Sequence, residues 1–203
     1  MSQTDEPTPA HDEEVVLDRA LTIPNLITIS RMLVIPLFAW VFLMGEYDAV
    51  ALVLLVLIGS TDWLDGFVAR RIGQVSKLGK LLDPVADRMA IIVVLLALVF
   101  RGVIPVLLAG ALLLRDLIVS VAFPVLEAKG FERIPVNRTG KWATAFIFAG
   151  MALAAGSVLE TPVRQSVEVA AVALLTAGAV AYWAAGFLYV KAIRRQVRER
   201  VTA

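Results

Sequence analysis

Residues 60–90 read STDWLDGFVARRIGQVSKLGKLLDPVADRMA, and four aspartates in this stretch decide how the rest of the chain is interpreted. Asp62 and Asp65 stand three residues apart. Asp83 and Asp87 stand four apart. Each pair therefore occupies one face of a helix. The chain on both sides is strongly apolar, and isolated carboxylates inside a bilayer are costly. We therefore predict that the two helix faces meet around one polar cavity within a membrane.

Carboxylates gathered in one cavity repel one another unless protons or cations neutralise them. We favour neutralisation of the carboxylates by divalent cations. Hard oxygen ligands select Mg2+ or Mn2+ over zinc in a chain that has no cysteine and a single histidine, His11, outside the apolar region. We predict two Mg2+ ions, which Mn2+ could replace, bound by Asp62, Asp65, Asp83 and Asp87.

A competing interpretation makes the aspartates ordinary helix-end charges that pair with basic neighbours such as Arg71 and Arg88. Small residues in the same stretch argue against it. Gly66, Ala69 and Gly79 fall where helices or a ligand would need close approach of the backbone.

The composition is that of a membrane protein. Of the 203 residues, 59% are hydrophobic, and the mean hydropathy is +0.81. We place one integral membrane domain at residues 18–203. Residues 1–17 are acidic and lack apolar periodicity, so we predict a disordered acidic tail there. The absence of cysteine excludes disulfides and thiol catalysis. With a net charge of +1, no nucleic-acid partner is expected.

Apolar segments lie at about 24–44, 49–70, 80–100, 103–127, 139–159 and 167–190, and only the last two contain an uncharged run of spanning length. The first four carry charged residues in one half, all on the same side of the membrane. Polar groups at that depth line a cavity filled by water or ligand. The charged residues that we expect to line this cavity are Arg31, Asp62, Asp65, Asp83, Asp87, Arg88, Arg115 and Asp116. The predicted fold is all-α: an integral membrane bundle of six transmembrane helices with a polar cavity at one end.

Basic residues are unevenly distributed among the loops. The connections after the second, fourth and sixth segments are rich in Lys and Arg, whereas the alternate connections are short and poor in them. By the positive-inside rule, both termini and the aspartate cavity face the cytoplasm. We therefore predict a multi-pass protein of the cytoplasmic membrane, with its active site facing the cytoplasm.

The carboxylates suggest phosphoryl chemistry. Two divalent ions about 3.5–4 Å apart stabilise the attacking and leaving oxygens of a phosphoryl displacement. A substrate that contains a pyrophosphate is therefore favoured. Arg70, at the cytoplasmic end of the second segment, is placed to bind phosphate. Asp87, one turn deeper than Asp83, is our candidate for the base that takes the proton of an attacking hydroxyl.

The aspartate stretch resembles the signature of the CDP-alcohol phosphotransferase family, D-x2-D-G-x2-A-R-x8-G-x3-D-x3-D, and every fixed position is matched. The resemblance extends from PNLIT at residues 24–28 to about residue 155. It implies six transmembrane helices, two divalent metals on the aspartates, Asp87 as the base and a homodimer. It also implies that the CDP moiety of CDP-diacylglycerol contacts Asn25, Thr28, Gly66, Ala69, Arg70 and Ser76.

The acceptor alcohol is less well defined. TIPNLITISRMLVIPLF, at residues 22–38, resembles phosphatidylglycerophosphate synthases and actinobacterial cardiolipin synthases. Both imply transfer of a phosphatidyl group to a glycerol-type acceptor with release of CMP, in phospholipid biosynthesis. Arg115-Asp116 and NRTGK at residues 137–141 depart from the usual phosphatidylglycerophosphate synthase pattern and favour the cardiolipin branch. The acceptor stays open between glycerol 3-phosphate and phosphatidylglycerol, with an inositol phosphate as an alternative.

Several interpretations stay open beside these. Arg115 and Lys141 are candidate ligands of an acceptor phosphate. Alternatively, Arg115 forms an ion pair with Asp116 or with another helix, and Lys141 is an interfacial lysine. Gly178 and Gly186 are compatible with close helix packing. A prenyl-diphosphate enzyme would carry two separate Asp-rich motifs, and a cation transporter would carry repeated halves; the sequence has neither pattern.

Overall fold

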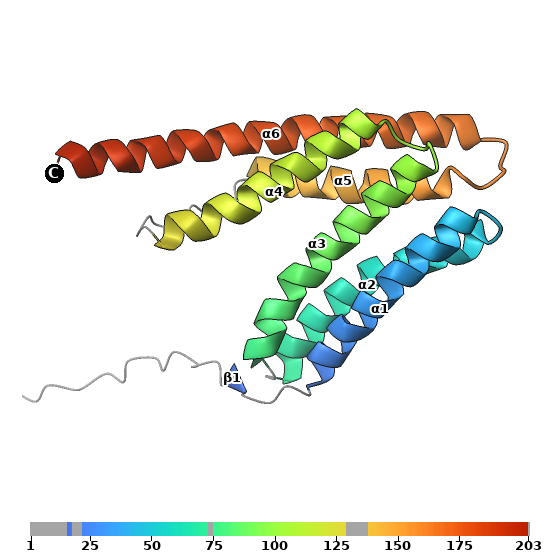
Figure 1. Cartoon of the computed structure of the whole chain (residues 1–203), viewed down its shortest axis with the longest axis horizontal. Helices are drawn as coiled ribbons and strands as arrows, with labels where there is room; N and C mark the ends of the chain where they lie inside the picture. The colour runs from blue at the N-terminus through green and yellow to red at the C-terminus, as the bar shows by residue number, and fades with distance from the viewer. Residues whose placement is uncertain (1–15, 18–21, 73–74, 129–137, 203) are drawn as a thin grey trace, which may run out of the picture.

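The computed structural model describes residues 16–17, 22–72, 75–128 and 138–202, and within these ranges the chain forms six α-helices. Figure 1 shows α1, α2 and α3 grouped together, whereas α4 and α5 lie along α6. The all-α prediction is confirmed, and each predicted apolar segment corresponds to one helix. The helices are α1 (Ile23–Met44), α2 (Asp48–Ile72), α3 (Lys77–Phe100), α4 (Val106–Ala128), α5 (Arg138–Gly156) and α6 (Arg164–Thr202).

Two very short strands accompany the helices. β1 (Val16–Leu17) pairs in parallel with β2 (Val75–Ser76), which lies between α2 and α3. The pairing joins the last two residues of the predicted acidic tail to the loop of the aspartate stretch. Residues 1–15 lie outside the described residues, so disorder of the tail stays a prediction.

The ends of α1 follow from its sequence. The hydroxyl oxygen of Thr22 caps the first turn and accepts a hydrogen bond from the backbone N–H of Asn25 at 3.4 Å. Pro24 lies in that turn, where a missing N–H leaves no intrahelical bond unmade. Gly45 ends the helix with a φ of 75°, a left-handed conformation that glycine adopts without a steric penalty.

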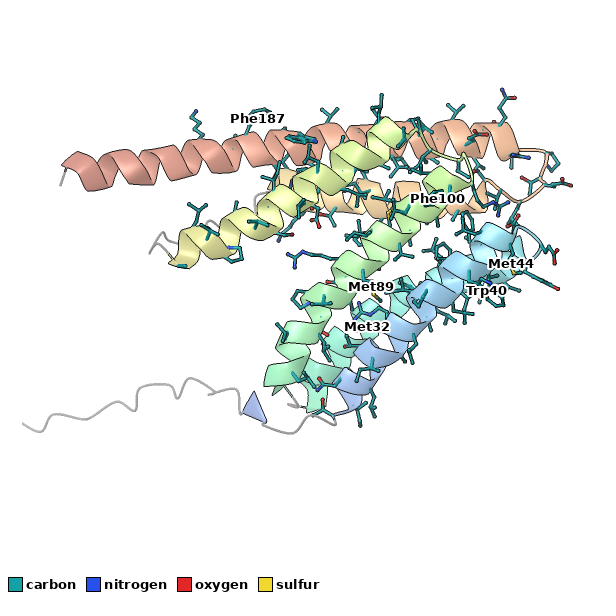
Figure 2. The ribbon with its side chains drawn as sticks, in the orientation of Figure 1. Met32, Trp40, Met44, Met89, Phe100 and Phe187 are labelled. Atoms are coloured by element: carbon teal, nitrogen blue, oxygen red, sulfur yellow. The ribbon has the colours of Figure 1, made fainter. Side chains whose placement is uncertain are left out.

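The core of the α1–α3 group is aromatic and aliphatic. The rings of Phe38 and Phe42 stack with their centroids 5.3 Å apart, and both belong to one buried apolar cluster with Leu95 and Leu98. Large apolar side chains also cover the outside, as Trp40, Phe100 and Phe187 do in Figure 2. An outer surface of this kind suits a lipid environment and would be costly in water.

Among the described residues, three helices are long and apolar enough to cross a membrane: the spans are Asn25–Met44, Val106–Leu126 and Arg164–Leu188. α2 adds a shorter apolar stretch, Asp48–Thr61. The sequence predicted a full uncharged span in the fifth segment as well. α5 ends at Gly156, so a stretch of spanning length within it has to include Lys141. The count of six spans stays a prediction.

α5 and α6 pack closely where each presents a glycine. A Cβ at Gly150 would lie 2.7 Å from Cγ of Leu175, and a Cβ at Gly178 would lie 2.8 Å from Cγ1 of Ile147. The close packing expected of Gly178 is therefore made within the chain, between α5 and α6. At Gly186 an added Cβ would meet nothing within 4 Å.

Gly178→Ala is expected to destabilise the protein by about 1–3 kcal/mol, because the added methyl group overpacks the α5–α6 contact. Gly186→Ala is the matched control on the same helix, with the same gain in helix propensity, and it should not lower stability. Thermal unfolding of both purified variants in detergent measures the effect. Equal unfolding midpoints would contradict the close α5–α6 contact.

Candidate active site

Two side chains of α1 hold the two aspartates of α3. The hydroxyl of Thr28 donates a hydrogen bond to Oδ1 of Asp83 at 2.8 Å. One turn further along α1, Nη1 of Arg31 donates to Oδ1 of Asp87 at 2.9 Å. Thr28 and Arg31 are three residues apart on α1, so both lie on one face of that helix. Asp83 and Asp87 are four apart on α3 and also share a face, and the two faces meet where α1 packs against α3. α1 therefore fixes the orientation of both carboxylates.

The buried donors on α1 contrast with the exposed carboxylate of Asp87. Thr28 and Arg31 are buried, Arg31 to the point that 2% of its side chain is exposed. The side chain of Asp87 is 49% exposed. The ion pair thus has its cation inside the helix group and its anion at an accessible surface.

Arg31 and Asp87 lie at the polar end of a cavity of about 320 Å3 that is otherwise apolar. A volume of this size falls in the range of small-molecule sites, roughly 300–1,000 Å3. The cavity has walls from α1, α2, α3 and α5. The apolar part is lined by residues that include Leu52, Leu55, Ile58, Ala90, Val94 and Met151.

Along their helices, the backbone positions of both aspartate pairs lie beyond residues that line this cavity. On α3, Asp87 and Asp83 precede the lining residues Val94 and Ala90 by seven residues, which is about two turns. On α2, positions 62 and 65 follow the lining residues Leu55 and Ile58 by the same interval. Both α2 and α3 pack against α1, and a single carboxylate group formed from the two helices stays a prediction. The structure describes only the backbone of Asp62, Asp65, Gly66, Ala69, Arg70 and Ser76.

The described part of the site fits a hard divalent cation in its donor chemistry. Asp83 and Asp87 supply carboxylate oxygens one turn apart, held by Thr28 and Arg31. Among the described side chains, which do not include Asp62 and Asp65, no three Asp, Glu, His or Cys residues form a group able to hold a metal. The two-metal site therefore stays a prediction.

The predicted CDP contacts on α1 lie at the same end. Asn25 is buried one turn before Thr28. The hydroxyl of Thr28, which the resemblance assigned to CDP, contacts Asp83. Their contact with the nucleotide stays a prediction, and the structure adds a second role for Thr28 in holding a carboxylate.

Comparison with known proteins identifies the family of this chain. The profile of the CDP-alcohol phosphatidyltransferase family matches residues 21–191. The chain belongs to the CDP-alcohol phosphatidyltransferase family. The matched range includes Thr28, Arg31 and the whole aspartate stretch.

The relatives of this CDP-alcohol phosphatidyltransferase include cardiolipin synthases and a glycerol-3-phosphate 3-phosphatidyltransferase. Cardiolipin synthase (CMP-forming) of Streptomyces coelicolor is 38% identical over 200 residues, which cover 95% of this chain and 92% of the relative. CDP-diacylglycerol–glycerol-3-phosphate 3-phosphatidyltransferase of Pseudomonas fluorescens is 38% identical over 128 residues, which cover 61% of this chain and 65% of the relative. Cardiolipin synthase (CMP-forming) of Rattus norvegicus is 38% identical over 119 residues, which cover 58% of this chain and 38% of the relative.

The contact with Asp87 is the feature of Arg31 that sequence reasoning missed. Arg31 itself was predicted to line the polar cavity, and it lines the cavity in the structure. The signal that could have found the contact is the position of the arginine three residues after Thr28, which matches the one-turn spacing of Asp83 and Asp87.

Arg115 on α4 contacts a side chain of α6. Its side chain is 6% exposed, and its guanidinium carbon lies 3.3 Å from the ring centroid of Tyr182 on α6. The neighbouring Asp116 accepts a hydrogen bond from the Tyr182 hydroxyl at 3.2 Å and lies 3.9 Å from Nε of Arg88. These contacts link α3, α4 and α6, and the contact of Arg115 is with an aromatic ring of another helix. Lys141 is exposed near the start of α5. Binding of an acceptor phosphate by Arg115 or Lys141 stays a prediction.

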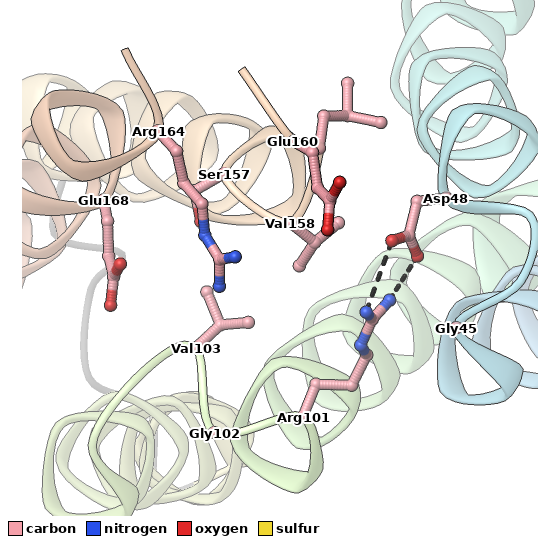
Figure 3. A pocket seen from close by; sticks show the side chains of 11 residues that line it. Gly45, Asp48, Arg101, Gly102, Val103, Ser157, Val158, Glu160, Arg164 and Glu168 are labelled. Atoms are coloured by element: carbon pink, nitrogen blue, oxygen red, sulfur yellow. Dashed lines mark hydrogen bonds and ion pairs between the residues drawn. The ribbon is translucent and has the colours of Figure 1, made fainter. Parts of the chain in front are cut away.

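A second, polar cavity of about 400 Å3 lies at the other end of α3 (Figure 3). Arg101 donates hydrogen bonds to both carboxylate oxygens of Asp48 and, at 3.0 Å, to the carbonyl oxygen of Phe42. By the rise of a helix, Arg101 is about 20 Å from Asp87. This Arg–Asp pair ties the turn between α1 and α2 to the end of α3, far from the aspartate stretch.

Proposed function

We propose that this chain transfers the phosphatidyl group of CDP-diacylglycerol to a glycerol-type acceptor hydroxyl and releases CMP. The observation that carries the proposal is the pair of α3 aspartates, oriented by Thr28 and Arg31. They lie at the polar end of an apolar cavity. Carboxylates suit metal-assisted chemistry on a pyrophosphate, and the apolar lining suits the acyl chains of a diacyl lipid.

Phosphatidylglycerol is the acceptor we favour. The relative that aligns with nearly the whole chain is a CMP-forming cardiolipin synthase, at 38% identity. Glycerol 3-phosphate is the second candidate, because the Pseudomonas fluorescens relative carries that acceptor in its name and is also 38% identical, over a shorter range.

The proposed roles follow the signature. Asp62, Asp65, Asp83 and Asp87 would hold two Mg2+ ions. When bound, these ions would neutralise the pyrophosphate and stabilise the leaving group. Asp87 takes the proton of the acceptor hydroxyl. The acceptor oxygen then bonds to the phosphorus that bears the diacylglycerol, the bond from that phosphorus to the bridging oxygen breaks, and CMP leaves with that oxygen. Arg70 binds a phosphate of the donor.

One assay tests the function and its acceptor. Purified protein receives CDP-diacylglycerol and Mg2+ with phosphatidylglycerol, glycerol 3-phosphate or an inositol phosphate in separate reactions, and released CMP is measured. We expect acceptor-dependent CMP with phosphatidylglycerol. CMP with glycerol 3-phosphate alone would overturn the favoured acceptor, and no CMP with any acceptor would overturn the function.

We also propose that the aspartate end faces the cytoplasm and, on the family resemblance, that the chain forms a homodimer. The absence of natural cysteine makes the orientation testable. Tyr47 and Lys191 are exposed at opposite ends of the helices. Lys191→Cys should react with an impermeant thiol reagent only from the cytoplasmic side, and Tyr47→Cys only from the opposite side. The reverse pattern would contradict the orientation.

A further inference from the structure

The ion pair between Arg31 and Asp87 has an uneven burial that calls for explanation. Burying a guanidinium costs several kcal/mol unless a partner compensates it. Here the cation is 2% exposed, while the carboxylate is 49% exposed. About half of the Asp87 side chain stays accessible while Arg31 holds its Oδ1 atom, so the carboxylate can contact a ligand at the same time.

The contact restricts a side chain that would otherwise rotate. An aspartate near an open cavity has several accessible rotamers, and a charge-assisted hydrogen bond of 2.9 Å from a buried arginine selects among them. Thr28 does the same for Asp83 from the preceding turn of α1. α1 therefore acts as a rigid element that supplies outer donors to two carboxylates of α3.

We propose that Arg31 is a positioning residue of the transfer reaction: it holds the Asp87 carboxylate in its working orientation and acts on the reaction through Asp87. The inference rests on the proposed function, in which Asp87 serves as metal ligand and base. Outer-sphere hydrogen-bond partners of this kind change metal affinity or activity by about 10–100-fold when removed.

Arg101 provides the matched comparison. Arg101 also pairs with an aspartate, Asp48, which is 17% exposed. Asp48 begins α2 and lies beside the end of α3 that is far from the aspartate stretch. Arg101→Met removes an Arg–Asp pair of the same chemistry without touching the aspartate stretch. It should lower the unfolding temperature and leave kcat of the folded protein unchanged.

The first test uses Arg31→Met and Arg31→Lys in the CMP-release assay. For Arg31→Met we expect kcat to fall about 10–100-fold while KM for CDP-diacylglycerol changes little. Arg31→Lys keeps the charge but loses the planar fork of donors, so it should recover part of kcat. A raised KM for the donor with unchanged kcat would make Arg31 a substrate ligand and overturn the proposal.

The second test is a double-mutant cycle in Mn2+ affinity, measured by electron paramagnetic resonance. Arg31→Met should weaken Mn2+ binding. In the Asp87→Asn background it should have no further effect, because its influence passes through Asp87. Additive losses, or tighter Mn2+ binding in Arg31→Met, would overturn the positioning role. Failure of the proposed function has a different result, which is absence of CMP release in the wild-type protein.

Discussion

Asp83→Asn is expected to abolish Mg2+-dependent release of CMP, with a loss of kcat of at least about 100-fold. The amide removes a negative charge from the predicted two-metal site, while it keeps the size of the side chain and can still accept a hydrogen bond from the Thr28 hydroxyl. Initial rates at saturating Mg2+ and CDP-diacylglycerol measure the effect. Asp62→Asn and Asp65→Asn should give losses of the same order.

Asp48→Asn is the control for this prediction. It makes the same chemical change on α2, where Asp48 pairs with Arg101 at the far end of α3. Its expected effect is lower thermal stability with kcat of the folded protein preserved. Full activity of Asp83→Asn at saturating Mg2+ would show that Asp83 is not a metal ligand.

The second large effect concerns Asp87. If its carboxylate takes the proton of the acceptor hydroxyl, Asp87→Asn should lower kcat by about 100–10,000-fold and leave KM for CDP-diacylglycerol nearly unchanged, because general base catalysis operates in the transition state. Steady-state kinetics with each substrate varied in turn separates the two parameters. A large rise in KM for the donor with normal kcat would instead identify Asp87 as a substrate ligand.

The helices were predictable because their limits are local. Uncharged apolar runs separated by charged or glycine-containing turns gave the segments that became α1 to α6. The sixth helix was predicted to end near residue 190, but α6 continues to Thr202. Hydropathy falls in this last part, yet Arg, Lys, Glu and Gln are good helix formers, and Ile193, Val197 and Val201 recur at helical spacing. The helix therefore continues past the apolar segment.

The site was predictable only where it depends on one helix. The spacing of Asp83 and Asp87 places both on one face of α3, and the structure has both held by the same neighbouring helix. The identity of that helix depends on how α1 packs against α3, which no local pattern encodes. The same holds for Arg115, whose contact with Tyr182 joins helices that are distant in sequence.

Counting bound metal tests the carboxylate site for two divalent ions, on which the proposed transfer reaction depends. Mn2+ titration of the purified protein in the presence of CMP, followed by electron paramagnetic resonance, gives the number of ions per chain. We expect two ions per chain in the wild-type protein and fewer in Asp83→Asn. Absence of Mn2+ binding together with CMP release that persists in the presence of a chelator would contradict the two-metal site.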